Sequence, residues 1–200
     1  MCSCPPDRTG LSEGESVQRA LVDQAKRGDR EAFDALARMV GDRCMAIAYR
    51  ILRDADRADD AVQAALIMAW RELRTLRDSD RFEPWLHRIL TNECYAEARR
   101  RRRWSTQIRL LPMPGQRESG EISAINDRDQ LDRAFRRLTI EQRSVIVFHH
   151  YVGLPLTEVA DRLGIPVGTA KSRLHHATNA LRASLEADAR SPSSSQERLA

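Results

Sequence analysis

The chain has few residues that break helices or crosslink a fold. Its 200 residues include 9 glycines, 8 prolines and 4 cysteines, and no two cysteines form a CxxC pair. Neither a disulfide framework nor a zinc knuckle is supported. Cys44 and Cys94 lie among apolar residues and are predicted to be small buried hydrophobic side chains. Cys2 and Cys4 fall in a terminus that we expect to be frayed.

Long apolar stretches are also missing. No run of about 18 apolar residues occurs, so no segment is predicted to span a membrane. The first eight residues lack the apolar segment of a secretory signal, and the chain is therefore expected in the cytoplasm. The hydrophobic share of 42% is ordinary for a globular chain and argues against wholesale disorder.

Lysine is nearly absent. Of the 33 basic residues only Lys26 and Lys171 are lysines, and the formal net charge is +4. A net charge of this size is a weak indication of an acidic partner. The run of arginines at residues 99–103 is a better one and favours contact with a polyanion over a merely solvated helix end.

The hydrophobic pattern predicts an all-α fold with two small helical domains joined by a flexible linker. No strand-like alternation of useful length appears, and apolar residues recur at helical spacing on both sides of a segment rich in Pro, Gly and Ser. The expected divisions are a disordered N-terminus (1–15), a helical domain (16–104), a linker (105–126), a second helical domain (127–189) and a disordered tail (190–200).

The strongest local signal lies at residues 156–176 of the second domain. Val159 and Leu163 mark a short helix, and Gly164 allows a tight turn in which Ile165 reaches the core. Pro166 suits the first turn of the next helix. That helix carries an apolar stripe, expected to be buried, of Val167, Ala170, Leu174, Ala177 and Leu181. The pattern is typical of a helix-turn-helix whose second helix enters the major groove.

Polar and basic side chains gather on the other side of this second helix. The candidate DNA-binding residues are Thr169, Lys171, Ser172, Arg173, His175 and His176, with Asn179 further along the same face. The alternative is an ordinary helical hairpin with a polar solvent face. The pairs His149-His150 and His175-His176 do not indicate a metal site, because neighbouring residues on a helix diverge by about 100°.

Two helices of the first domain have informative outer faces. Between residues 56 and 74, the apolar Ile67 and Met68 interrupt a polar face, which favours either a protein-binding surface or cover by another helix of the domain. Between residues 84 and 103, a row of polar side chains at helical spacing can meet phosphates, base edges and unstacked bases. These first-domain DNA-binding candidates are Arg88, Asn92, Tyr95 and Arg99.

Four segments in order make the stretch from about residue 16 to 185 resemble a bacterial RNA polymerase sigma factor of the extracytoplasmic-function (ECF) group. They are GDREAF at 28–33, DDAVQ at 59–63 followed by Ala69-Trp70, the stretch from Phe82 to Asn92 with the arginine run behind it, and GIPVGTAKSRL at 164–174. Each segment alone is moderately specific, whereas four in sequence are hard to reach by chance.

The resemblance implies a dissociable promoter-specificity subunit without cofactors. It implies that Asp60, Gln63 and Ile67 bind core RNA polymerase, although Ala64 stands where many members carry an acidic residue. The helix carrying Asn92, with the loop at residues 76–82, would read and melt the minus-ten element, and the helix-turn-helix would read the minus-thirty-five element. An anti-sigma partner is also implied. The sequence has no phosphate-binding glycine loop and no nucleophile–base pair, so the chain is not expected to be an enzyme.

Two other readings stay open from the residues alone. The first is a stand-alone helix-turn-helix regulator that binds operator DNA, which leaves the patterned outer faces of the first domain without a role. The second is an adaptor whose basic helix binds RNA or an acidic protein. Capture of core polymerase separates the sigma interpretation from the regulator, and comparing the salt dependence of binding to duplex promoter and to RNA tests the adaptor.

Overall fold

The computed structural model describes residues 13–108 and 126–190, and every regular element in these ranges is a helix. The first domain holds α1 (Glu13–Lys26), α2 (Arg30–Leu52), α3 (Ala55–Glu72), the short 3-10 turns η1 (Leu73–Thr75) and η2 (Ser79–Arg81), and α4 (Phe82–Ile108). The second holds α5 (Asn126–Arg137), α6 (Ile140–Ile146), the π-helical turn η3 (Val147–Tyr151), α7 (Leu156–Leu163) and α8 (Val167–Arg190). None of the described helices is long and apolar enough to cross a bilayer.

Several sequence predictions fall partly or wholly outside the described residues. These are the frayed terminus with Cys2 and Cys4, most of the linker and the tail. At the edges of these segments, α1 already begins at Glu13 and α4 continues to Ile108, so both helices extend past the expected limits of the first domain.

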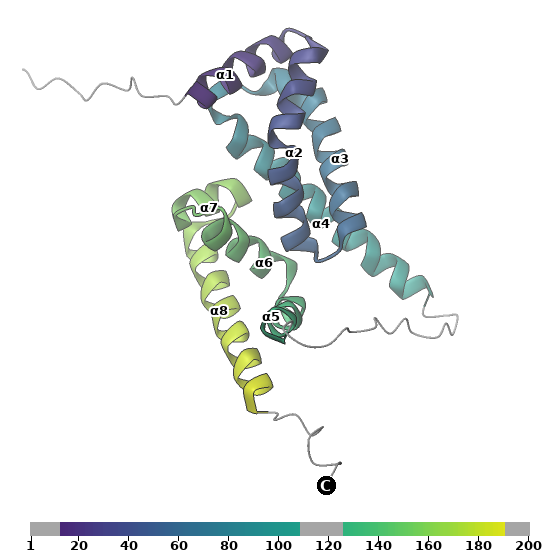
Figure 1. The fold of residues 1–200 in the computed structure, drawn as a ribbon, viewed down its shortest axis with the longest axis vertical. Helices are drawn as coiled ribbons and strands as arrows, with labels where there is room; N and C mark the ends of the chain where they lie inside the picture. Colours follow the sequence, from purple (N-terminus) through teal and green to yellow (C-terminus); the bar gives the residue numbers. More distant parts are fainter. Residues whose placement is uncertain (1–12, 109–125, 191–200) are drawn as a thin grey trace, which may run out of the picture.

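The helices of the first domain begin where short acidic side chains cap them. Asp29 accepts a hydrogen bond from the Ala32 backbone N–H at 3.2 Å, and Asp54 accepts one from that of Arg57 at 3.2 Å. Each carboxylate satisfies a donor that the first helical turn leaves unpaired. Because only Arg53 and Asp54 connect α2 to α3, the two helices form an antiparallel pair, against which α1 and α4 pack (Figure 1).

The core of the first domain follows the predicted apolar stripes. On α3 the side chains of Val62, Ala65 and Ala69 are buried, and on α4 those of Leu86, Leu90 and Cys94 are buried. Cys44 of α2 is buried as well, as predicted, and burial raises the pKa of this thiol to about 11 and that of Cys94 to about 12. Both cysteines therefore act as small apolar core residues.

The second domain contains the predicted helix-turn-helix. Gly164 ends α7 with φ of 64°, a left-handed conformation that favours glycine, and the Ile165 N–H donates to the Ala160 carbonyl at 3.0 Å. Pro166 comes directly before the first residue of α8, and its carbonyl accepts the hydrogen bond from the Ala170 N–H at 3.1 Å that begins the helix. Ala170 and Ala177 are buried as predicted, but Val167, the first residue of α8, is 46% exposed.

The two domains pack directly against each other, which the sequence did not predict. Helix α7 contacts α4, and α6 contacts both α2 and α4 (Figure 1). Val145, Phe148 and Val159 of the second domain join the buried apolar cluster of the first. A smaller cluster around Leu138 and Ala177 holds α5, α6 and α8 together.

Candidate nucleic-acid and polymerase interface

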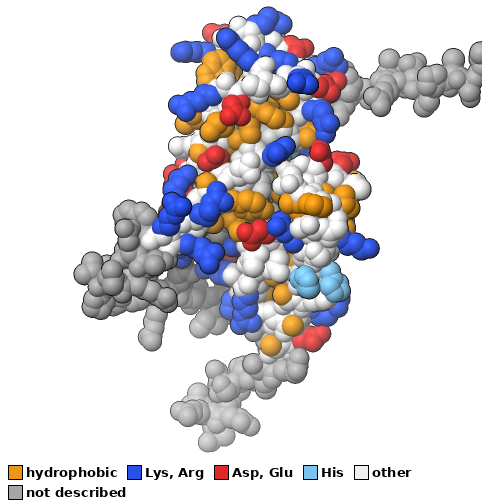
Figure 2. Space-filling model, turned by 180° about the vertical axis from the view of Figure 1, so that it is seen from behind, with side chains coloured by type: hydrophobic (Ala, Val, Ile, Leu, Met, Phe, Trp, Pro, Cys, Tyr) orange, Lys and Arg blue, Asp and Glu red, His pale blue; other side chains and the backbone are white. Residues whose placement is uncertain are grey.

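The predicted row on α4 lies on one side of that helix. Arg88, Asn92 and Arg99 are exposed, and Tyr95 is less exposed than these three because it is half-buried. Lys and Arg side chains gather on the flank of the molecule where α4 ends (Figure 2). Glu93, on the same helix, lies 3.9 Å from the Arg100 guanidinium. A cationic helix face with one amide and one aromatic ring can contact both phosphates and unstacked bases.

The second domain covers part of this face. Gly164, in the turn of the helix-turn-helix, lies beside Arg88 of α4. If position 164 carried a side chain, its Cβ would lie 3.6 Å from the Arg88 guanidinium. The Tyr95 ring lies at the domain junction, where burial raises the pKa of its hydroxyl and the nearby Ser144 side chain lowers it. The packed arrangement therefore places the turn of the helix-turn-helix and helix α6 beside Arg88 and Tyr95 of α4.

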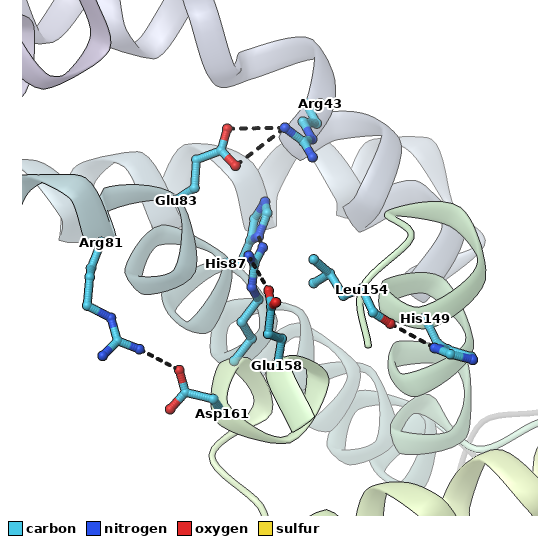
Figure 3. A network of polar contacts seen from close by, with 9 residues as sticks. Arg43, Arg81, Glu83, His87, His149, Leu154, Glu158 and Asp161 are labelled. Carbon is cyan, nitrogen blue, oxygen red and sulfur yellow. Dashed lines mark hydrogen bonds and ion pairs between the residues drawn. The ribbon is translucent and has the colours of Figure 1, made fainter. Parts of the chain in front are cut away.

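A buried polar contact joins the domains at this place. The Arg162 guanidinium of α7 donates from Nη1 to Nδ1 of His87 on α4 at 2.8 Å (Figure 3). His87 is 2% exposed and Arg162 is 9% exposed. Burial first and the Arg162 charge second lower the pKa of His87 to about 3. Burial also lowers the pKa of Arg162, while Glu158 at 3.4 Å raises it.

Exposed ion pairs surround this buried contact. Arg81 at the end of η2 binds Asp161 of α7 at 2.8 Å, which is a second link between the domains (Figure 3). Arg43 of α2 binds Glu83 of α4 at 3.1 Å within the first domain. Because more than half of the Arg81 and Asp161 side chains is exposed, this pair contributes little to stability by itself.

The recognition helix α8 presents most of its predicted residues to solvent. Lys171, Ser172, His175 and His176 are exposed, and Thr169 and Arg173 are half-buried. The Ser172 hydroxyl donates to the Thr169 carbonyl at 3.0 Å, and the Asn179 amide lies 3.0 Å from Nε2 of His175. Within the described residues no three His, Cys, Asp or Glu side chains come together in a group that could hold a metal ion.

The outer face of α3 carries the predicted polymerase-binding residues. Asp60, Gln63 and Ile67 are all exposed, and Ile67 is 54% exposed. Met68 instead packs partly against the core, so the two apolar side chains of this face have different roles. Ile67 borders a pocket of about 420 Å³. The pocket is lined by Arg30, Phe33, Asp34, Leu66, Ile67 and Trp70.

Sequence reasoning missed the residues that join the domains. His87 and Arg162 are separated by 75 positions, and each lies in a helix whose pattern explains only its own domain. Arg53 was missed as well, although it binds Asp132 of α5 from the end of α2. Arg53 ends α2 with φ of 59°, a left-handed conformation in which glycine is the usual residue. Because an arginine stands there, the sequence gives no signal of the helix end or of the partner.

Comparison with known families defines the class of protein to which these elements belong. A family model described as Sigma-70 region 2 matches residues 36–104, which include α3 and most of α4. A second, described as Sigma-70, region 4, matches residues 128–181, which include the helix-turn-helix. The order of the two matches is that of a sigma-70 protein.

Curated relatives narrow this class. The ECF RNA polymerase sigma factor SigL of Mycobacterium tuberculosis (strain ATCC 25618 / H37Rv) is 34% identical over 167 residues, which cover 80% of this chain and 94% of the relative. The ECF RNA polymerase sigma factor SigW of Bacillus subtilis (strain 168) is 26% identical over 183 residues, covering 86% and 98%. The chain belongs to the ECF group of RNA polymerase sigma factors, and it serves as a sigma factor in transcription initiation.

Solved structures share the fold. CnrH in complex with the cytosolic domain of CnrY has 27% sequence identity and a TM-score of 0.63, with 86% of this chain and 99% of that chain covered. The sigma factor RpoE in complex with the anti-sigma factor NepR from Bartonella quintana has 26% identity and a TM-score of 0.62, with 78% and 98% covered. The family membership removes the main support for a stand-alone operator-binding regulator.

Proposed function

We propose that α3 docks this chain on core RNA polymerase through Asp60, Gln63 and Ile67. The observation that carries the proposal is the exposure of Ile67, an apolar side chain beside a pocket lined by Phe33 and Trp70. An exposed apolar group next to a hollow is typical of a protein-binding surface. Asp60 and Gln63 supply the polar rim of the same surface.

The proposed role of α4 is to recognise and open the minus-ten element. Arg88 and Arg99 neutralise phosphates, Asn92 bonds base edges, and Tyr95 stacks on an unpaired base, with help from the loop at residues 76–82. Holding a base outside the duplex offsets an unstacking cost of a few kcal/mol. No hydrolysis by this chain is required, so it acts without enzymatic activity and without a cofactor.

The proposed role of α8 is to read the minus-thirty-five element in the major groove. Lys171 and Arg173 bind phosphates, while Thr169, Ser172, His175 and His176 face base edges. In the packed arrangement the turn of the helix-turn-helix lies beside Arg88, one of the proposed minus-ten contacts. We infer that the domains separate before the chain engages both promoter elements.

The proposal also includes an anti-sigma factor and core polymerase as partners and the cytoplasm as the location. The solved relatives CnrH and RpoE are each in complex with a second protein, which for RpoE is an anti-sigma factor. We propose that an anti-sigma factor likewise binds this chain and releases it to core polymerase. The chain would then work in the cytoplasm, where transcription takes place.

Run-off transcription on a library of promoter fragments tests the proposed function. Purified core polymerase with this protein should yield specific transcripts that share two short upstream elements. Core polymerase alone is the control and should not yield them. Tight binding to duplex DNA without any redirection of core polymerase would contradict the proposal.

A further inference from the structure

The domain junction contains a pocket of about 600 Å³ that is lined mainly by arginines. Arg53, Arg57, Arg101 and Arg102 reach it from the first domain. Arg136, Arg137 and Arg143 reach it from the second. None of the residues proposed to bind polymerase or promoter DNA lines this pocket.

Arginines outnumber carboxylates in the pocket lining that the structure describes: seven arginines line it together with one acidic residue, Glu141. Outside the lining, Asp132 binds both Arg53 and Arg136, and Arg57 lies 3.5 Å from Glu97 and 3.9 Å from Asp54. The lining therefore gathers guanidinium groups of both domains in one place.

Part of the charge is also removed from water. The Arg53 and Arg57 side chains are only 13% and 15% exposed. Nε of Arg53 and Nε of Arg143 are buried with no hydrogen-bond partner among the described residues. Burial and then the neighbouring Arg53 and Arg57 charges lower the pKa of Arg143. Poorly solvated, mutually repelling cations are stabilised by an anion that binds between them.

The chemistry of the lining selects the anion. Guanidinium groups bind phosphate oxygens through paired hydrogen bonds, and several arginines together suit a chain of phosphates better than a single one. The pocket volume is in the usual range for small ligands, roughly 300–1,000 Å³. We propose that this pocket binds an oligophosphate anion, either inorganic or carried by a nucleotide, and that the bound anion holds the two domains together.

Anion binding is coupled to domain packing because the arginines that line the pocket come from both domains. Arginines of both domains complete the pocket, so an anion that needs both sets binds the packed arrangement and not the separated one. At a ligand concentration about 100 times its Kd, the ratio of packed to separated molecules rises about 100-fold. The anion would thereby oppose the separation that promoter binding requires. The binding itself does not depend on the proposed function.

Titration calorimetry on the full chain with inorganic triphosphate, in about 150 mM salt to screen long-range attraction, tests the site. We expect saturable binding at one site, weakened at least tenfold by Arg101→Glu or by Arg136→Glu. The matched control is Arg38→Glu, an exposed arginine of α2 outside the pocket with the same change in charge. Its affinity should change less than twofold. Equal losses in all three variants, or no binding at millimolar triphosphate, would overturn the proposal.

Two further experiments identify the class of anion and test whether its binding holds the two domains together. ATP that binds as tightly as triphosphate assigns the site to the phosphate chain alone, whereas tighter ATP binding assigns it to a nucleotide. Small-angle X-ray scattering should show a more compact average shape with triphosphate for the unaltered chain but not for Arg136→Glu. A short DNA duplex that displaces triphosphate and leaves the shape unchanged would overturn the proposal in favour of a nucleic-acid backbone.

Discussion

Arg162 and His87 form a buried hydrogen bond of 2.8 Å that joins the helix-turn-helix domain to the promoter-opening helix. The guanidinium has no acceptor, so it donates and Nδ1 of His87 accepts, which leaves the imidazole proton on Nε2. A second proton on His87 would have to enter at Nδ1, facing the Arg162 cation. The His87 ring also packs on Phe148 at 5.3 Å between centroids, so protonation would disturb an apolar contact as well.

Domain packing should therefore weaken in mild acid. The pKa of His87 is about 3 in the packed arrangement, and we expect it to return towards 6.5 when α7 leaves α4. The packed state binds fewer protons, so its stability is complete above pH 6.5 and falls by about 1.4 kcal/mol for each pH unit below that value. Scattering between pH 7 and pH 5 should show the domains separating.

The control for this effect is His87→Gln, whose amide oxygen can accept from Arg162 but does not titrate. Its scattering profile should stay flat between pH 7 and pH 5. The charged groups around the site are Arg162, Arg43, Glu83 and Glu158, and all four are the same in both proteins. If the original chain and His87→Gln separate alike, His87 is not the responsible group.

The exposed apolar side chain on α3 should matter for polymerase binding and not for folding. Ile67→Ser removes an apolar contact from a residue that is 54% exposed, so the free energy of unfolding should change by less than about 0.5 kcal/mol. Affinity for core polymerase should fall about tenfold or more, as for a central interface residue. Val17→Ser, on the 51% exposed Val17 of α1, is the control and should bind normally.

Asn92 should be required for promoter opening rather than for initial binding. Its side chain is exposed on α4 and offers both a donor and an acceptor to base edges. Asn92→Ala should reduce the open complex about tenfold, measured by permanganate reactivity of unpaired thymines, while binding to the closed duplex changes little. An equal reduction of both would show that Asn92 contributes only general affinity.

His175 should determine part of the upstream sequence preference. One base-edge contact is worth about 1–3 kcal/mol, so His175→Ala should relax selection at one or two positions of the minus-thirty-five element. Thr178→Ala is the matched control, because the Thr178 hydroxyl already bonds the Leu174 carbonyl at 2.9 Å within α8. Selection from a randomised promoter pool measures both. An unchanged preference in His175→Ala would remove this residue from the readout.

The sequence determined the helices, the helix-turn-helix and most of the buried stripes. Apolar spacing of three and four residues places side chains such as Val62 and Leu90 on one face regardless of what the distant chain does. The same reasoning placed Ile67 and Asn92 on outer faces, where they are exposed. Val167 was expected in the buried stripe and is 46% exposed, and of the two alternatives left open for Met68 the structure favours cover by the domain's own helices.

Only the tertiary structure decided how the two domains meet. The sequence pattern assigned no role to Arg162 of α7 or to Arg53 at the end of α2. In the structure Arg162 is buried against His87 of the first domain, and Arg53 is half-buried and binds Asp132 of α5. Helical periodicity repeats every few residues and carries no information on such docking, so the His87–Arg162 contact and the arginine-lined pocket follow from packing alone.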